Sequence, residues 1–200
     1  AYTNFCGFLA EHFKRKINRF EISNEPNVKP KEGVFEGEFP NNPNSELYGK
    51  VAARAAEIIK NKNPKAEIIF GNVALFDPEF IKNGLTEVKK HEEELRNKGK
   101  LKPEQYLIDY VGFHPYRENP DAPSTVIEKG EGQFTEEQKE AAEKKWGYKS
   151  YEDQLEIYRE IIDGYSPKIK LINTEIGWQI GKEGPNSVAD EKTQKEEKEK

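Results

Sequence analysis

Residues 66–72 read AEIIFGN, and this short apolar run between two helical segments decides the fold. A strand of this length that is apolar throughout is typical of a parallel sheet covered on both faces. Residues 46–61 precede it as a predicted helix with Ser45 as its expected N-cap. The apolar stripe expected on that helix comprises Leu47, Val51, Ala55, Ile58 and Ile59. Asp77 followed by Pro78 predicts the start of the next helix, which continues to about residue 98.

The same alternation extends toward the N-terminus and into the second half of the chain. Residues 3–15 have apolar side chains at helical spacing, and residues 17–24 have the composition of a strand. Two further strands are predicted at residues 107–114 (LIDYVGFH) and 169–175 (IKLINTE), with a helix capped by Ser150 between them. The order of elements therefore alternates helix and strand four times, which predicts parallel βαβ units.

One domain is expected over residues 1–200. Between residues 115 and 149 the chain makes a long excursion, with its own short helix opening at Thr135 in a capping-box pattern. Residues 188–200 form a charged tail that resembles the polar first turns of a truncated helix. Four strands are present, and a closed (β/α)8 TIM barrel takes eight, so an α/β fold in the form of an incomplete barrel is the expectation.

The composition narrows the class of partner. The chain has a net charge of -5, and 11 Phe, 9 Tyr and 2 Trp indicate a folded domain. The sequence has no positively charged stripe of the kind that a nucleic-acid partner would need, and no apolar run approaches the roughly 20 residues of a membrane span. Cys6 is the single cysteine, so neither a disulfide framework nor a cysteine metal site is expected, and we expect Cys6 to pack as a small apolar residue.

Polar groups stand at the ends of three predicted strands. These are Asn24-Glu25-Pro26, His114-Pro115-Tyr116, and Thr174-Glu175 with Trp178 just beyond. The carboxyl ends of parallel strands meet at one edge, where barrel enzymes have their active sites. Two carboxylates that converge there suit glycosidic cleavage, in which one carboxylic acid protonates the leaving oxygen while a carboxylate about 5–5.5 Å away attacks the anomeric carbon.

Strand alternation predicts which neighbours share a face with these groups. If Glu25 points inward, Glu21 and Ser23 do so too, and Phe20 and Ile22 pack against the helices. If Glu175 points inward, Asn173 and Leu171 should share its face, while Gly112 leaves space beside His114.

The phrase HFKRKINRFEISNEPN (residues 12–27) resembles the fourth strand of clan A glycoside hydrolases, which ends in Asn-Glu-Pro. LINTEIGW (171–178) resembles their seventh strand, which ends in the nucleophilic Glu, and VGFHPY (111–116) resembles the His-x-Tyr of the sixth strand in family five and its relatives. The resemblance covers the whole chain in the right order. It implies a TIM-barrel retaining glycosidase, of which this sequence contains strands four to seven.

The resemblance also implies a role for each matching residue. Glu25 would be the acid/base and Glu175 the nucleophile of a double displacement. Asn24 would hydrogen-bond the sugar 2-hydroxyl, and Tyr116 would orient Glu175. His114 would line the site near the sugar and Trp178 would stack on a sugar ring. The first three strands and the eighth, which supply further site residues in these families, have no counterpart in the sequence, and Ser23 replaces an aromatic residue common in the family phrase.

Several alternatives stand beside this interpretation. The same fold could bind carbohydrate without cleaving it, or the two glutamates could transfer protons in another kind of barrel enzyme. Glu25, His114 and Glu175 could in principle hold a divalent ion, but the expectation is that no metal and no cofactor is needed. A carbohydrate substrate implies a secreted or periplasmic full-length protein, by analogy with where polysaccharides occur.

Overall fold

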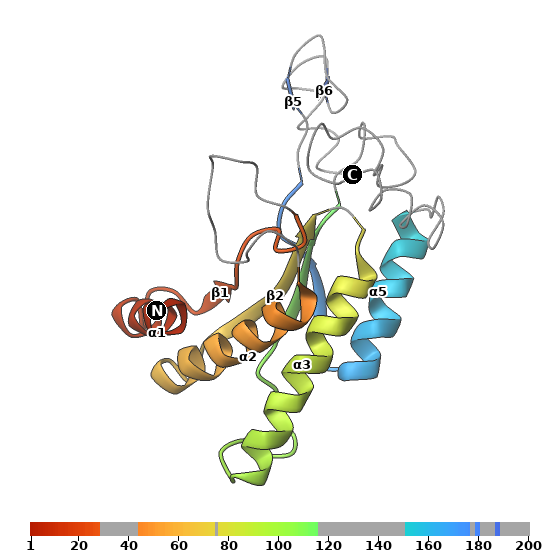
Figure 1. The fold of residues 1–200 in the computed structure, drawn as a ribbon. Coiled ribbons are helices and arrows are strands. Elements are labelled where there is room, and N and C mark those ends of the chain that lie inside the picture. Colours follow the sequence, from red (N-terminus) through yellow and green to blue (C-terminus); the bar gives the residue numbers. More distant parts are fainter. Residues whose placement is uncertain (29–43, 75, 116–150, 177–178, 181–186, 189–200) are drawn as a thin grey trace.

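The computed structural model describes residues 1–28, 44–74, 76–115, 151–176, 179–180 and 187–188. The short helix expected at Thr135, the Ser150 cap and residues 189–200 of the tail lie outside these ranges. Helices and strands alternate along the chain as predicted (Figure 1). The first half contains α1 (Tyr2–His12), β1 (Arg19–Glu21), α2 (Ser45–Lys62) and β2 (Glu67–Ala74). The second half contains α3 (Pro78–Asn97), β3 (Tyr110–His114), α5 (Tyr151–Tyr165) and β4 (Lys170–Asn173).

The four strands form one parallel sheet in the order β1-β2-β3-β4. Arg19 pairs with Glu67, Ile69 with Tyr110, and Tyr110 with Lys170, so all four strands run in the same direction. A register shift between Gly71 and Val73 interrupts the pairing of β2 with β3. In a separate two-stranded sheet, β5 (Gln179–Ile180) pairs with β6 (Ser187–Val188).

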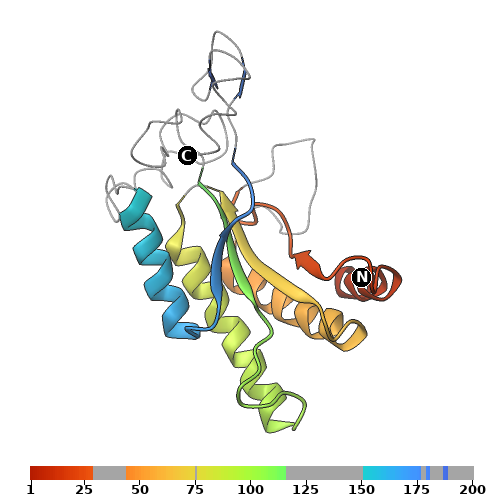
Figure 2. The same cartoon turned by 180° about the vertical axis from the view of Figure 1, so that it is seen from behind.

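Helices α2, α3 and α5 cover one face of the sheet, and none of the described helices covers the other (Figures 1 and 2). The core fills the space between the sheet and these helices. It contains Ile68, Phe70 and Val111 from the strands and Tyr48, Ile81, Tyr158 and Ile162 from the helices. Phe20 and Ile22 also face the helices, as the alternation predicted. No helix of the described residues is long and apolar enough to span a membrane.

The buried phenol of Tyr48 connects α2 to the two strands that it covers. Its hydroxyl donates to the carbonyl of Ile22 at 2.9 Å and accepts from the amide of Gly71 at 2.8 Å. Burial is the main reason that the pKa of Tyr48 is raised, so the hydroxyl stays protonated and can make both bonds. This contact fixes the end of β1 against β2, just before the chain reaches Glu25.

Capping residues at the starts of α2 and α3 agree with the prediction except at one position. Asp77 accepts from the amide of Phe80 at 3.1 Å with Pro78 in the first turn, as predicted. The N-cap of α2 is Asn44, whose side chain accepts from the amide of Leu47 at 2.8 Å, and Ser45 is the first helical residue. The predicted cap was therefore one residue late, because both neighbours are good capping residues.

The first two helices bury mainly their small residues, and the buried face of α2 differs in part from the prediction. Helix α2 buries Ala55 and Ile59 of the expected stripe together with Tyr48 and further small residues, while Leu47 at the start of the stripe is 38% exposed. Helix α1 packs through Cys6 and Ala10, and its Phe5 and Phe8 are exposed in the described structure. Small residues let the two helices approach each other closely, since a Cβ at Gly7 would lie 2.5 Å from Ile58. Cys6 is buried as a small apolar residue, as expected.

Candidate active site

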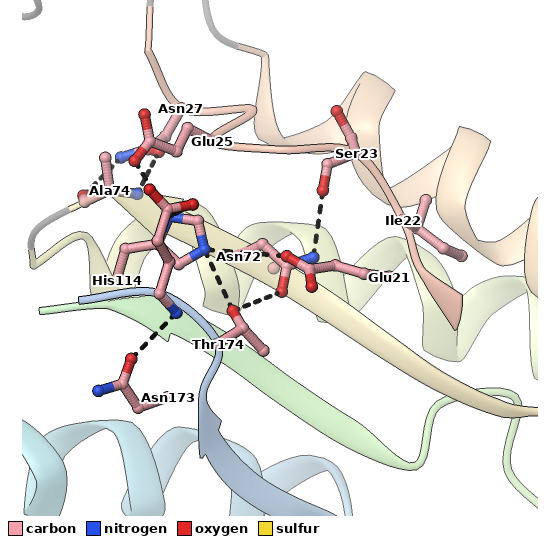
Figure 3. Close-up of polar contacts among 12 residues, drawn as sticks. Glu21, Ile22, Ser23, Glu25, Asn27, Asn72, Ala74, His114, Asn173 and Thr174 are labelled. Atoms are coloured by element: carbon pink, nitrogen blue, oxygen red, sulfur yellow. Dashed lines mark hydrogen bonds and ion pairs between the residues drawn. The ribbon is translucent and has the colours of Figure 1, made fainter. Parts of the chain in front are cut away.

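The carboxyl ends of three strands bring Glu25, His114 and Glu175 together. Figure 3 shows Glu25 beside the ring of His114. His114 ends β3, and the two glutamates follow β1 and β4. Glu25 Oε1 lies 3.0 Å from His114 Nδ1, and Glu175 Oε2 lies 3.9 Å from the same nitrogen. One ring nitrogen of His114 and one carboxylate oxygen of each glutamate lie within 4.8 Å of one another. Residues that are 150 positions apart in sequence therefore share one polar cluster.

The backbone around Glu25 adopts an unusual conformation that aims its side chain at His114. Ser23 and Glu25 have φ angles of 65° and 43°, in the left-handed region that residues other than Gly rarely adopt. The amide of Glu25 donates to the carbonyl of Asn72 at 3.0 Å, which anchors this turn to β2. Such strain persists only where the surroundings hold it, and it gathers at functional sites.

Asn27 fixes the far side of the same turn. This buried side chain pairs with the backbone of Ala74, donating to its carbonyl at 3.1 Å and accepting from its amide at 2.9 Å. Asn27 also donates to Asp77 at 3.2 Å, which links the turn to the start of α3. The sequence analysis did not single out Asn27. Its one signal in the sequence is its position directly after the Asn-Glu-Pro motif.

His114 is fully buried and contacts groups on both sides of its ring. Its Nε2 lies 3.1 Å from Thr174 Oγ1 and 3.8 Å from Glu21 Oε1, opposite the nitrogen that faces Glu25. Burial alone would lower its pKa, but the hydrogen bonds to Glu21 and Glu25 and the charges of Glu25 and Glu175 outweigh it and raise the pKa to about 9. At neutral pH the ring is an imidazolium that donates from both nitrogens.

Thr174 and Asn72 extend this network, and sequence reasoning assigned a role to neither. Thr174 Oγ1 donates to Asn72 Oδ1 at 3.5 Å, and Asn72 Nδ2 donates to the carbonyl of Ser23 at 3.2 Å. Gly112 leaves the space for this amide, because a Cβ at Gly112 would lie 2.0 Å from Asn72 Oδ1. The space expected beside His114 thus holds the side chain of Asn72.

The strand that carries Glu175 corrects one prediction. Leu171 and Asn173 were expected to share the inward face with Glu175, but they line a hollow with Phe113 and Leu155 on the helix side of the sheet. Thr174 is the residue that points to His114. The side chain of Asn173 accepts from the amide of Glu175 at 3.1 Å, and this turn ends the strand alternation before Glu175.

The remaining predicted residues do not join the cluster in the described structure. Asn24 is exposed, and among the described residues no hydrogen bond joins its side chain to Glu25, His114 or Glu175. Tyr116 and Trp178 lie outside the described residues. Of the two residues expected to share a face with Glu25, the side chain of Glu21 approaches His114. Ser23 joins the network through its backbone carbonyl, which accepts from Asn72, and not through its hydroxyl.

The cluster has the donor types of a divalent-metal site, namely one imidazole nitrogen and two carboxylates. Thr174 on the second ring nitrogen resembles the outer hydrogen bond that metal-binding histidines make. However, His114 Nδ1 already lies within hydrogen-bond distance of Glu25, and its raised pKa means that a metal would have to displace a tightly held proton. These residues are therefore better suited to proton transfer than to metal binding.

No family model matches the sequence, and none of the curated proteins matches it. Solved structures are similar in fold. Cel44A, a family 44 endoglucanase from Clostridium thermocellum, has 18% identity and a TM-score of 0.55 over 88% of this chain and 40% of that one. A family 44 xyloglucanase from Paenibacillus polymyxa, solved with xyloglucan, has 16% identity and a TM-score of 0.54 over 88% of this chain and 39% of that one.

A family 39 enzyme from Xanthomonas axonopodis pv. citri has 17% identity and a TM-score of 0.52 over 90% of this chain and 30% of that one. The chain therefore spans about 40% or less of the length of these three relatives. All three are glycoside hydrolases of clan A. The parallel sheet with its helices and these likenesses together give the chain the fold of a clan A glycoside hydrolase barrel, over the part of that barrel that it covers.

Proposed function

We propose that this chain carries the two catalytic carboxylates of a retaining β-glycoside hydrolase. The observation that carries the proposal is the separation of Glu25 and Glu175, whose nearest oxygens in the cluster lie within 4.8 Å. Retaining enzymes hold their two carboxyl groups about 5–5.5 Å apart, whereas inverting enzymes need about 6.5–9.5 Å to admit a water molecule. The arrangement at the carboxyl ends of parallel strands and the barrel fold both support this choice.

Burial supports the assignment of roles. Glu175 has 52% of its side chain exposed, which leaves its carboxylate open to attack the anomeric carbon and form a glycosyl-enzyme ester. Glu25 is only 18% exposed and contacts His114, as suits a group that donates a proton to the leaving oxygen and then takes one from the attacking water. Breaking the C–O bond thus leaves a neutral alcohol and an ester, and water then restores Glu175 as a carboxylate.

His114 would act beneath both carboxylates and not on the sugar. As an imidazolium 3.0 Å from Glu25 and 3.9 Å from Glu175, it would stabilise the negative charge of Glu175 before the attack and that of Glu25 once this residue has given up its proton. Its ring has no exposed surface, so contact with a substrate would fall to other groups. Asn24 and Trp178 remain the proposed contacts with sugar, and Tyr116 the residue proposed to orient Glu175, on the strength of the sequence motifs alone.

The proposed substrate is a β-linked poly- or oligosaccharide. Two of the similar structures are an endoglucanase and a xyloglucanase, the second solved with xyloglucan, and these names support a polysaccharide substrate. No cofactor enters the proposed mechanism. In this proposal the full-length protein meets its substrate outside the cytoplasm, where such polysaccharides occur.

The test uses variants of the full-length gene product with a panel of aryl β-glycosides, xyloglucan and cellulose derivatives. Glu175→Gln should lower kcat by on the order of 10⁴-fold or more on every substrate, because the nucleophile is lost. Glu25→Ala should slow substrates with poor leaving groups far more than activated aryl glycosides, since the latter need little protonation.

Glu67→Gln is the matched control, because Glu67 is an exposed carboxylate at the opposite end of the sheet. It should keep wild-type kcat. Equal and mild losses from Glu25→Ala and Glu175→Gln would reject the roles. Retention of glycan binding by a wild-type protein that cleaves none of the panel would instead favour a carbohydrate-binding barrel without catalysis.

A further inference from the structure

Two polar side chains outside the proposed catalytic pair connect the strand ends that carry it. Asn72 follows Gly71 in β2, where the pairing with β3 shifts register, and Thr174 directly precedes Glu175. Asn72 is fully buried, and its φ of 50° lies in the left-handed region, which Asn tolerates better than most residues. A buried amide in a strained backbone costs stability, so its contacts need an explanation.

The hydrogen bonds through these residues run in one direction. The imidazolium of His114 donates from Nδ1 to Glu25 and from Nε2 to Thr174. The hydroxyl of Thr174 then donates to Asn72 Oδ1, and Asn72 Nδ2 donates to the carbonyl of Ser23. A carbonyl can only accept, so it fixes the orientation of the amide, and the amide in turn fixes the direction of the hydroxyl.

The network closes into a ring around the turn that carries Glu25. Besides its side-chain bonds, Asn72 accepts through its backbone carbonyl from the amide of Glu25 at 3.0 Å. Asn72 therefore contacts the chain on both sides of Asn24, and it also contacts Thr174, the residue before Glu175. Figure 3 shows the side-chain bonds of Asn72 to Ser23 and Thr174. Moving the turn that carries Glu25 relative to the strand end that precedes Glu175 would break at least one of these bonds.

We infer that Asn72 and Thr174 are positioning residues that set the separation of Glu25 and Glu175. The inference rests on the proposed function, since it assigns these two residues a part in that same site. Neither residue contacts the substrate in this account. They hold the two carboxylates at the spacing that a retaining mechanism requires, and a displacement of about 1 Å at such a site can cost on the order of 100-fold in rate.

The first test removes the Thr174 hydroxyl at nearly constant shape. Thr174→Val should lower kcat about 10- to 100-fold with KM changed less than about threefold, because orientation and not binding is lost. Thr174→Ser keeps the hydroxyl and should restore most of kcat. Thr86→Val is the matched control, since among the described residues the Thr86 hydroxyl donates to the carbonyl of Lys82 alone, on the exposed surface of α3. It should leave kcat unchanged.

The second test replaces the Asn72 amide. Asn72→Asp keeps the shape and still accepts from Thr174, but it loses the donor to Ser23 and should lower kcat by a similar factor. Asn63→Asp is its control, because Asn63 is also buried and donates to Ile17 and Asn18 at the opposite end of the sheet. It should lower the melting temperature but leave kcat near wild type at temperatures where it stays folded.

A measurement that does not depend on activity separates this inference from the proposed function. The chain has three histidines, so the imidazole nitrogens of His114 can be followed by NMR. Thr174→Val should shift the Nε2 signal of His114 and leave His12 and His91 unchanged. Wild-type kcat and an unshifted signal in Thr174→Val, with Glu175→Gln inactive, would overturn the positioning role alone. Full activity in Glu175→Gln would overturn the proposed function instead.

Discussion

The two ends of the parallel sheet differ in how they hold charge. At the amino ends of the strands, charges form separate pairs of opposite sign, such as Arg19 with Glu67 at 2.8 Å and Lys60 with Asp109 at 2.8 Å. At the carboxyl ends, three carboxylates lie within 4 Å of one buried imidazole. Paired surface charges cost little and contribute little, whereas an excess of one charge around a buried group opposes folding and indicates function.

The backbone differs between the two ends in the same way. Four described residues other than Gly have left-handed φ angles, and Ser23, Glu25 and Asn72 of these lie at the carboxyl ends. The fourth, Arg15, lies in the turn after α1. A hollow of about 800 Å³ lies at the amino ends and is lined by the paired charges, but it contains none of the clustered carboxylates. The size of this hollow therefore does not indicate the candidate site. The strained backbone and the unbalanced charge at the carboxyl ends do indicate it.

Among changes that would abolish the difference between the two ends of the sheet, replacement of His114 should have the largest effect. His114→Asn keeps a donor near Nδ1 but loses the contact with Thr174 and the positive charge between the glutamates, so kcat should fall about 100-fold in steady-state assays. His91→Asn is the matched control. His91 pairs with Glu57 at 2.8 Å between α2 and α3, away from the strand ends, and its loss should leave kcat within about twofold.

The same pair of variants tests the pH dependence of stability. The pKa of His114 rises from 6.5 to about 9 on folding, so its contribution is complete below pH 6.5 and is lost as the pH rises through about 9. This corresponds to a fall on the order of 3 kcal/mol in the free energy of unfolding across that window, as measured by urea titration. His114→Asn should flatten the profile, and an equally steep profile in that variant would contradict the assigned cause.

A smaller effect is expected from adding a methyl group at two glycines. In Gly112→Ala the new Cβ would meet Asn72 Oδ1 at 2.0 Å, so the buried amide must move and unfolding should become easier by about 1–3 kcal/mol. In Gly164→Ala, on α5, the Cβ meets no atom of the described residues within 4 Å, and the helix should gain about 0.5–1 kcal/mol. Thermal unfolding measures both, and equal melting temperatures would show that Gly112 is not constrained by Asn72.

Local patterns predicted the fold well. The order of elements followed from apolar runs and caps, and Asp77 with Pro78 starts α3 as expected, because a cap depends only on residues a few positions apart. The face of Leu171 was predicted wrongly, since the turn at Asn173 ends the alternation before Glu175. A period of two holds only while the strand continues.

The site was predictable only in its outline. The motifs named Glu25, His114 and Glu175, which the structure brings together, because carboxyl ends of parallel strands must meet. Asn72 was missed because its role depends on a register shift and on contacts with residues 49 and 102 positions away. The one local signal was a Gly-Asn pair inside an apolar strand, which is typical of a bulge.

The most direct test of the account is the stereochemistry of rescue by azide in variants of the full-length gene product, with an activated aryl β-glycoside as substrate. In Glu25→Ala, azide should attack the glycosyl-enzyme ester and give the β-glycosyl azide, because Glu175 still forms that ester. In Glu175→Gly, azide should enter the vacated space and give the α-glycosyl azide. Proton NMR of the products distinguishes the two anomers. The same anomer from both variants, or no azide product from either, would show that Glu25 and Glu175 do not act on opposite sides of one sugar carbon.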